Sequence, residues 1–496
     1  MTTLKSKVKQ FSKDTFFYGL GGAITSLISF FKAPILTRIF VPGDYGYLDF
    51  ISTTFAFFLV IAGLNMISGL FRYYYEMKDD SERKDLLMTG LVFTLGTALV
   101  MLLSLQLLKP TIINYITKNS GAGRNNDLFV QLVILRTPFY LIQSFFLSIL
   151  RLQRRAKLFF FISLGEGILN FILTITLVVF LKQHLFGVFF SNLFTVVLGA
   201  LVVVFLLRNE IKGKFSICLF KKMMRVALPS FPSVFINLAF AKMSNLFIYQ
   251  FSNELSLGLY SIAQKVGTLI NLVGYAYRSA FLPFSMEIMH QENHKKDYNV
   301  FFRYAVLFFG IAAFTVSLFT KPIFFIIAPP SYYEAIKYVP FILFALAFDF
   351  SHFSLVTGIQ ISKRTEFATY AQALSLVIST ILSYFIIRQF SAYGAAMISL
   401  PIYVVKYTFI YIFSQKLYKI DFDFGIERVF FILFALAILH SYIVANMSFV
   451  TNLFVSIFTL FITLSFIYKI SLTKNERSVI ALLARKYFNM LLSRQT

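Results

Sequence analysis

Tryptophan is absent from this chain of 496 residues, and cysteine occurs once, at Cys218. A single cysteine excludes a disulfide framework within the chain and any metal site built from several cysteines. Charge is also scarce, because only 14% of the residues are charged, whereas soluble domains carry about 25%. Acidic residues are the scarcer kind, with 22 Asp and Glu against 46 Lys and Arg. So few charges cannot coat a soluble protein of this length, which excludes an ordinary cytosolic enzyme.

Apolar residues dominate what is present. Hydrophobic residues make up 58% of the chain, and the mean hydropathy is +0.75. A membrane-crossing helix needs about 20 mostly apolar residues, and we find about fourteen such stretches, separated by mostly short polar segments. We therefore predict an all-α polytopic membrane protein. The expected spans are 15–36, 48–70, 86–108, 127–150, 158–180, 186–207, 226–250, 257–283, 302–320, 337–360, 366–387, 393–413, 426–446 and 449–468.

The basic residues alternate in density between the two sides of these spans. With the N-terminus placed in the cytoplasm, about 32 of the 46 Lys and Arg fall in cytoplasmic segments and about 8 in outer loops. A missed or extra helix would reverse every later loop, so the bias supports the number of spans. It predicts a multi-pass membrane protein with both termini in the cytoplasm. Because topology explains most of the positive charge, we expect no nucleic-acid partner.

The two halves of the chain match weakly at three landmarks separated by about 210 residues. The matching segments are 46–50 and 258–262, 154–155 and 363–364, and 186–187 and 393–394. Six spans per half would give both halves the same orientation, related by a pseudo-two-fold axis along the membrane normal. Alternating access through a cavity between the halves is the mechanism expected of this arrangement. We predict a six-helix lobe at 1–210, a second at 211–415, and two further helices with a basic tail at 416–496.

Six basic side chains remain inside the spans once the loops are removed. Each central charge costs about 2.5–3.5 kcal/mol to insert, so six of them indicate a polar interior rather than a lipid-facing surface. A net-positive cavity suits an anionic substrate such as phosphate or pyrophosphate, because Lys and Arg offer charge-assisted hydrogen bonds to it. The candidate substrate-binding residues are Lys32, Arg136, Lys242, Lys265, Arg278 and Lys406.

Two acids, Glu166 and Asp349, lie well inside the spans, and His352 follows three residues after Asp349. These three residues are candidates for coupling transport to a proton or sodium gradient, since an i, i+3 pair on one helix face could relay protons. A structural hydrogen-bonded pair explains Asp349 and His352 equally well.

The basic residues also have structural explanations. Lys32 and Lys242 lie near the outer boundary, where long side chains extend to the interface. The ion pairs that would neutralise the others are Arg136 with Glu166, and Asp349 with Lys406 or Arg278.

Motifs of enzyme chemistry are missing from the sequence. It holds no GxxxxGK[ST] phosphate-binding loop, no GxSxG nucleophile elbow and no HExxH zinc motif. The five histidines show no metal-ligand spacing. We therefore predict a transporter rather than an enzyme, with no catalytic residues, no metal and no cofactor.

The first fifty residues carry a pattern typical of one family. Tyr18-Gly19 lies at the start of the first span, the segment 34–38 ends it, and Pro42-x-x-Tyr45-Gly46 follows. This opening resembles that of polysaccharide-biosynthesis membrane proteins. These are the O-antigen flippases (Wzx-type) and their relatives in the multidrug/oligosaccharidyl-lipid/polysaccharide exporter (MOP) superfamily. The number of spans and the six-plus-six repeat agree with that MATE-like architecture over nearly the whole chain.

The resemblance implies a flippase for an undecaprenyl-pyrophosphate-linked oligosaccharide in the bacterial plasma (inner) membrane. It implies a role in lipopolysaccharide O-antigen or capsule biosynthesis, with a polysaccharide polymerase and glycosyltransferases as partners. A lipid II flippase and a multidrug or cation antiporter of the same superfamily remain alternatives, although cationic drugs favour an acidic cavity. A membrane glycan polymerase would normally show a large outer loop with catalytic Arg or His residues, which the sequence does not contain.

Overall fold

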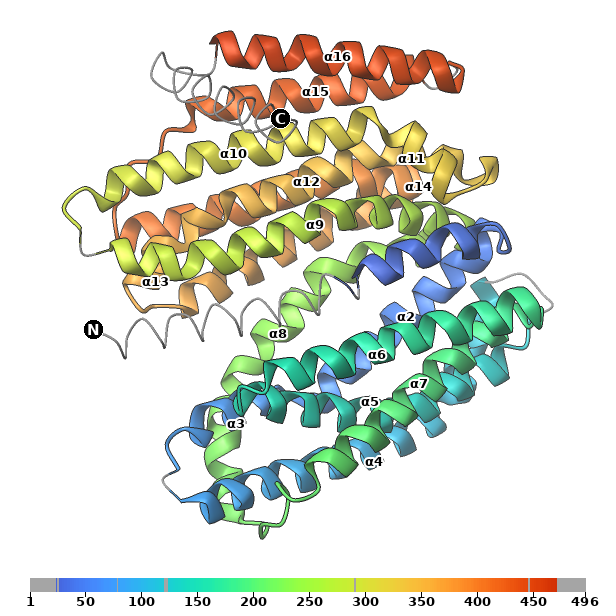
Figure 1. Ribbon diagram of the computed structural model, residues 1–496, viewed down its shortest axis with the longest axis vertical. Helices are drawn as coiled ribbons and strands as arrows, with labels where there is room; N and C mark the ends of the chain where they lie inside the picture. The colour runs from blue at the N-terminus through green and yellow to red at the C-terminus, as the bar shows by residue number, and fades with distance from the viewer. Residues whose placement is uncertain are drawn as a thin grey trace, which may run out of the picture.

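The computed structural model describes residues 24, 26–77, 79–119, 124–289, 291–444 and 447–470. This part of the chain consists of helices joined by short turns and contains no strand. Most helices run along one direction, so that their loops gather at two opposite ends of the molecule (Figure 1). The all-α polytopic fold predicted from the sequence is confirmed.

The helices form an N-terminal lobe, a C-terminal lobe and an additional pair (Figure 1). The helix Ser26–Thr37 lies where the two lobes meet. The N-terminal lobe comprises α2 Pro42–Gly63, α3 Met66–Tyr74, α4 Asp80–Asn119, α5 Asn126–Leu152, α6 Ala156–Ile175, the π-helical turn η1 Thr176–Phe180 and α7 His184–Leu207.

The C-terminal lobe follows without a break in the chain. Its elements are α8 Ile217–Phe251, α9 Glu254–Ile288, α10 His294–Leu318, α11 Thr320–Ile327, η2 Pro330–Tyr338, α12 Val339–Ser351, η3 His352–Val356, α13 Thr357–Ile361 and α14 Glu366–Leu417. The additional pair, which packs beside α10, comprises η4 Phe424–Ile426, α15 Glu427–Ile443 and α16 Phe449–Ile470.

Eleven helices in the described residues are long and apolar enough to cross a membrane. The expected spans 366–387 and 393–413 both lie in α14, which is kinked at Ser391. The expected span 257–283 lies in α9, and the helix Ser26–Thr37 covers the described part of the expected first span. Each of the about fourteen predicted spans thus has a helical counterpart. For the first span, residues 15–23 and 25 lie outside the described residues.

Several boundaries differ from the prediction; for example, α4 runs to Asn119 rather than ending near 108. The expected span 48–70 is divided into α2 and α3 by Leu64 and Asn65, which both adopt left-handed backbone conformations. The helix α8 begins at Ile217 rather than near 226. Lys221 and Lys222 in its first turns are exposed good helix formers, so the helix extends beyond its apolar segment.

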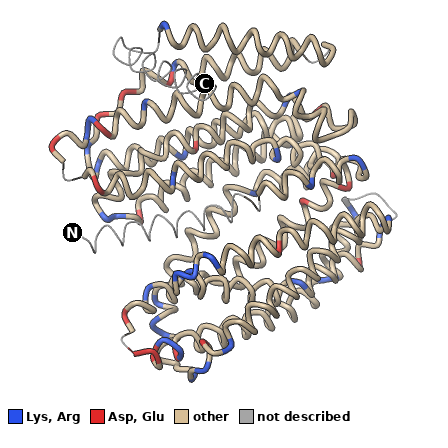
Figure 2. The backbone as a smooth tube through the Cα atoms, in the orientation of Figure 1, with Lys and Arg blue, Asp and Glu red and all other residues tan. Residues whose placement is uncertain are grey.

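Lys and Arg gather at one end of the molecule, which is called the basic end below (Figure 2). The loops between α3 and α4, α5 and α6, α7 and α8, and α9 and α10 lie at this end (Figure 1). The opposite end, called the far end, carries the end of α4, the start of α5 and the loops that follow η1 and α11. Loops that the charge pattern assigned to one side of a membrane therefore lie at one end of the structure.

The lobes approach most closely where α2 crosses α9. A Cβ on Gly46 would lie 1.9 Å from the carbonyl oxygen of Glu254, and a Cβ on Gly258 would lie 1.7 Å from that of Pro42. Only glycine lets two helix backbones approach this closely. Gly46 and Gly258 begin the first pair of matching segments in the sequence repeat, so the contact joins equivalent positions of the two halves.

Candidate functional site

A cavity of about 620 Å³ lies between the two lobes. Its walls come from the helix Ser26–Thr37, α2 and α7 on one side and from α8, α9, α12 and α14 on the other. A second cavity of about 690 Å³ extends along α5, α6 and α7. Because they share several lining residues, the two lie side by side, and together they are called the central cavity below. The shared residues are Ser29, Asn192, Lys265, Thr268, Asn271 and Tyr275.

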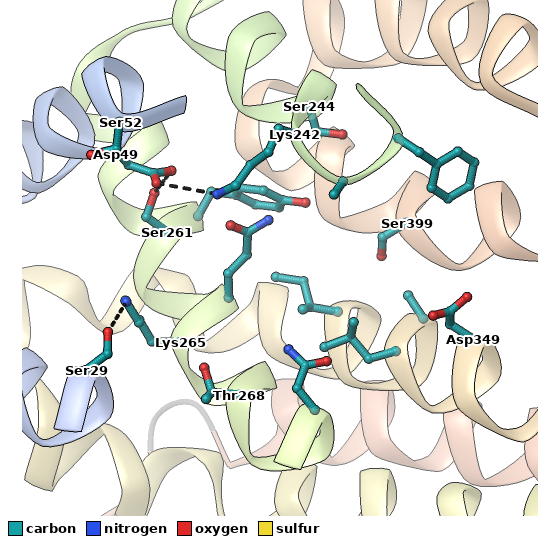
Figure 3. A pocket seen from close by; sticks show the side chains of 18 of the residues that line it. Ser29, Asp49, Ser52, Lys242, Ser244, Ser261, Lys265, Thr268, Asp349 and Ser399 are labelled. Atoms are coloured by element: carbon teal, nitrogen blue, oxygen red, sulfur yellow. Dashed lines mark hydrogen bonds and ion pairs between the residues drawn. The ribbon is translucent and has the colours of Figure 1, made fainter. Parts of the chain in front are cut away.

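Two lysines that face the central cavity hydrogen-bond to neutral side chains. Lys32 Nζ donates to Asn170 Oδ1 at 2.7 Å, and Lys265 Nζ donates to Ser29 Oγ at 3.0 Å (Figure 3). Ser29 and Lys32 are three residues apart on one helix, so their side chains lie on the same face. Neither ammonium group has a carboxylate within 4.0 Å in the described residues. The two charges therefore remain available to an anion in the cavity.

Arg136 lines the second part of the central cavity, and Glu166 lines it as well. Glu166 Oε2 accepts a hydrogen bond from Gln143 Nε2 at 2.9 Å. The guanidinium of Arg136 lies over the ring of Tyr140, and its buried Nε has no hydrogen-bond partner. No ion pair within 4.0 Å joins Arg136 to Glu166 or to another acid in the described part of the chain. Arg136 is thus a third cation without a close counter-ion.

Lys242 lies near Asp49, an acid that was not among those expected inside the spans. Its Nζ is 3.7 Å from Asp49 Oδ1, while Asp49 Oδ2 accepts hydrogen bonds from Asn245 at 2.5 Å and Ser261 at 2.8 Å (Figure 3). Asp49 belongs to the N-terminal lobe, whereas its three partners belong to the C-terminal lobe. The group therefore joins the lobes at the cavity wall.

Asp349 on α12 binds two of the predicted cations. Arg278 Nη2 donates to Asp349 Oδ2 at 2.5 Å and to its backbone oxygen at 3.0 Å. Lys406 Nζ donates to Asp349 Oδ1 at 2.6 Å, and the Tyr407 hydroxyl donates to the same backbone oxygen at 2.7 Å. Either base was expected as a partner of Asp349, and in the structure both bind it.

His352 points away from this group. Its Nε2 lies 2.8 Å from Glu427 Oε1 at the start of α15, and its Nδ1 lies 3.0 Å from the carbonyl oxygen of Phe348. The imidazole is buried and does not line the central cavity. Asp349 and His352 thus contact different partners, and no hydrogen bond joins their side chains.

Five of the six predicted basic residues line the central cavity, and Lys406 does not. Its ammonium lies over the rings of Phe240, Tyr403 and Tyr407 behind Asp349. Of the three ion-coupling candidates, Glu166 and Asp349 line the cavity. Asp49 was missed because it lies at the second position of an expected span, where an acid is easily assigned to the boundary.

Contacts between the lobes close the cavity toward the far end. Arg124, in the loop between α4 and α5, pairs with Asp44 at 2.6 Å and also with Glu254 of the C-terminal lobe. Burial acts against its charge, but the two carboxylates outweigh burial and leave the pKa of Arg124 above its ordinary value. The Tyr332 hydroxyl adds a bond of 2.8 Å to the carbonyl oxygen of Phe40. The far end is therefore held shut in this structure.

Comparison with protein families shows which family this chain belongs to. The family described as "Polysaccharide biosynthesis protein" matches residues 11–289, which is more than half of the chain. This chain is therefore a member of the polysaccharide biosynthesis protein family, and it is a multi-pass membrane protein. The family resemblance of the first fifty residues is confirmed.

Two curated relatives come from Haemophilus influenzae. One, described as "Uncharacterized membrane protein", is 23% identical over 292 residues, covering 57% of this chain and 67% of its own length. The other, "Lsg locus putative protein 1", is 22% identical over 296 residues, covering 56% and 67%.

Two solved structures show the same fold. The lipid II flippase MurJ in an inward closed conformation has a TM-score of 0.69 at 16% identity, over 92% of this chain and 99% of that one. An inward-facing multidrug resistance transporter of the MATE family and MOP superfamily has a TM-score of 0.62 at 14% identity, over 79% and 94%. The predicted MATE-like architecture is confirmed.

Proposed function

We propose that this chain is a flippase that carries an undecaprenyl-pyrophosphate-linked oligosaccharide across the bacterial plasma membrane for surface polysaccharide biosynthesis. The observation that carries the proposal is the set of three cavity-facing cations, Lys32, Arg136 and Lys265, which have no acidic partner within 4.0 Å in the described residues. Unneutralised buried cations are costly, and a bound anion would remove that cost.

The size and polarity of the cavity fit a phosphorylated glycan. The two parts of the central cavity, about 620 and 690 Å³, each lie in the range of small-molecule sites, and together they could hold several sugar units. Phosphate oxygens would accept charge-assisted hydrogen bonds from the cations. Neutral hydrogen-bonding residues, among them Ser52, Ser244, Gln264 and Asn271, supply donors and acceptors for sugar hydroxyls.

Transport by alternating access follows from the two-lobe arrangement. In this structure the lobes are joined at the far end by the Gly46–Gly258 crossing and the Arg124 ion pairs. We place the basic end in the cytoplasm, as the positive-inside rule requires, and we propose that both termini lie on the same side of the membrane. Loading would then take place from the cytoplasmic side, and separation of the far-end contacts would release the cargo to the outer leaflet.

The cavity charge also separates the alternatives. A multidrug antiporter for cationic drugs would favour a net-acidic cavity, whereas Asp349 and Asp49 are both engaged by bases here. Glu166, which has no base within 4.0 Å in the described residues, is outnumbered by the three unpaired cations. A lipid II flippase would present the same cations to the same pyrophosphate. Lipid II and an oligosaccharide repeat unit would therefore be distinguished by the cavity residues that contact the sugars. We assign no catalytic residue, which sets the proposal apart from a glycan polymerase.

Complementation tests the proposal. Lys32→Ala, Arg136→Ala and Lys265→Ala are each expressed in a strain lacking this gene, and surface polysaccharide is measured at matched membrane levels of protein. We expect loss of most of the polysaccharide for the Ala variants and its retention for Lys32→Arg and Lys265→Arg. The proposal is overturned if all three Ala variants retain full polysaccharide, or if the wild-type protein restores only a strain lacking its lipid II flippase.

A further inference from the structure

Asp349 holds one more cation than its own charge can neutralise. Arg278 approaches Oδ2 from α9, and Lys406 approaches Oδ1 from α14. The three side chains are largely buried, with 26% of Arg278, 13% of Lys406 and 10% of Asp349 exposed. Taken together the group carries a net charge of +1. One of the two bases is therefore in excess at this carboxylate.

The two bases differ in how firmly they are held. Lys406 lies behind Asp349, away from the cavity, with its ammonium 4.9–5.5 Å from the centres of three aromatic rings. Such rings stabilise a cation that cannot reach water. With the Tyr407 hydroxyl 3.2 Å from the same Oδ1, Lys406 would still satisfy and neutralise Asp349 if Arg278 left.

Arg278 has hydrogen-bonding capacity beyond its bonds to Asp349. It lines the cavity, and its guanidinium carbon lies over the rings of Phe350 and Phe353, 4.5 and 4.9 Å from their centres. Its hydrogen bonds to Asp349 come from Nη2, while its buried Nε has no partner. A guanidinium can bind a phosphate through two N–H groups at once. These contacts, which are not directional hydrogen bonds, would let the guanidinium reorient while it stays against the rings.

We propose that Asp349 is a built-in counter-anion which Arg278 exchanges for a diphosphate in the cavity. In the empty state Arg278 pairs with Asp349. When the anion enters, Arg278 transfers its hydrogen bonds to the phosphate oxygens, and Lys406 alone neutralises Asp349. This inference deepens the proposed function and rests on it, because it makes Asp349 a specificity-determining residue for the cargo although Asp349 never touches the anion.

The exchange favours phosphate over carboxylate. An incoming group gains Arg278 only by replacing the bonds to Asp349, and a single carboxylate, such as that of an acidic sugar, offers no more than Asp349 already does. A diphosphate carries more negative charge and more acceptor oxygens, so it can displace Asp349. The arrangement therefore selects the pyrophosphate portion of the cargo.

Binding measurements on the full chain in lipid nanodiscs test the exchange. Inorganic pyrophosphate and a short polyprenyl pyrophosphate are titrated calorimetrically, with malonate as the carboxylate comparison. Tighter binding of the polyprenyl compound assigns the anion to a lipid headgroup, and equal binding assigns it to a free phosphate ligand. Asp349→Asn releases Arg278, so pyrophosphate affinity should rise about tenfold and the preference over malonate should shrink. Lys406→Met leaves Asp349 dependent on Arg278, so affinity should fall about tenfold, and Lys406→Arg should restore it.

The double variant Asp349→Asn/Lys406→Met separates exchange from a simple charge effect. In the wild type the charges of Asp349 and Lys406 cancel, and in the double variant both positions are neutral, so the net charge next to Arg278 is the same. If net charge alone set the affinity for pyrophosphate, the double variant would bind it as the wild type does, whereas exchange predicts tighter binding. Adding Arg278→Gln to Asp349→Asn should abolish the gain. Equal weakening by Asp349→Asn and Lys406→Met, or wild-type affinity of the double variant, would overturn the proposal. If the complementation test fails while this order of affinities holds, the exchange stands and the cargo is another diphosphate.

Discussion

Asp49 and Ser261 lie 212 residues apart and are joined by a hydrogen bond of 2.8 Å. They occupy equivalent positions of the sequence repeat, one turn beyond Gly46 and Gly258. Contact between equivalent residues is expected where a pseudo-two-fold axis passes between two halves. The halves have diverged at this point into an acid and a hydroxyl, which complement each other across the axis. The repeat thus supplies the interface that holds the lobes together at the far end.

Widening this crossing should destabilise the closed far end. Gly46→Ala places a methyl group against the Glu254 carbonyl, which is backbone and cannot move aside. We expect a loss of about 1–3 kcal/mol, typical of overpacking, measured as a lower melting temperature in detergent. Gly165→Ala on α6 is the matched control, because its Cβ meets nothing within 4 Å. Equal stability of the two variants would show that the crossing tolerates a methyl group.

Removing the Arg124 ion pairs should open the far end more often. Arg124→Gln breaks the bonds to both Asp44 and Glu254, which belong to different lobes. In a Cys218→Ser background, a cysteine at the cavity position Ser52 reports opening through its reaction with a membrane-impermeant maleimide added outside. We expect a several-fold faster reaction in the Arg124→Gln variant.

Arg388→Gln is the control for this measurement. Arg388 is exposed and hydrogen-bonds to Tyr384 one turn away on the same helix. This bond lies within one lobe and does not connect the two lobes. Its variant should react at the wild-type rate. A wild-type rate for Arg124→Gln as well would mean that the ion pairs do not hold the far end.

The sequence predicted the membrane fold because apolar length and alternating charge are local signals. Even the 52-residue helix α14 was expected as two spans, and the structure bends it at Ser391. The break at Leu64 and Asn65 was not foreseen, because apolar residues lie on both sides of it and neither residue is a glycine or a proline. Asparagine is enriched in left-handed conformations, but one asparagine in an apolar segment is a weak signal, and a left-handed leucine such as Leu64 depends on tertiary packing.

The cavity charges were predictable as a set, but their partners were not. Lys32, Arg136 and Lys265 were found by their depth in the spans, and the structure places them in one cavity. Whether a base is neutralised depends on which helices pack together. Arg278 and Lys406 come from helices α9 and α14, which meet α12 at Asp349, and no spacing along the chain reveals that meeting.

His352 should prove structural rather than part of the transport path. His352→Phe removes the hydrogen bond to Glu427, whose side chain is 22% exposed and can recruit water in its place. We expect a loss of about 1–2 kcal/mol in thermal unfolding, with unchanged pyrophosphate affinity. His352→Phe/Glu427→Leu, which removes both partners, should recover part of the stability. Loss of pyrophosphate binding in a stable His352→Phe protein would contradict this assignment.

Glu166 is the acid that we expect to respond to an ion gradient. Its carboxylate faces the central cavity and has no base within 4.0 Å in the described residues, whereas Asp349 is bound by two. A proton or sodium ion can therefore bind Glu166 without displacing a tethered base. In proteoliposomes that contain a polyprenyl-pyrophosphate-linked oligosaccharide, an imposed gradient should accelerate wild-type flipping. Glu166→Gln should flip at the gradient-free rate under both conditions.

The control for this last measurement is Glu334→Gln. Glu334 is an exposed acid in η2 at the far end, where it pairs with Lys337. Its variant should respond to the gradient as the wild type does, because its carboxylate already contacts the solvent. A full response of Glu166→Gln would exclude Glu166 as the coupling residue. If the wild type also shows no response, flipping runs on the concentration difference of the cargo alone, and Glu166 serves only as the hydrogen-bond partner of Gln143.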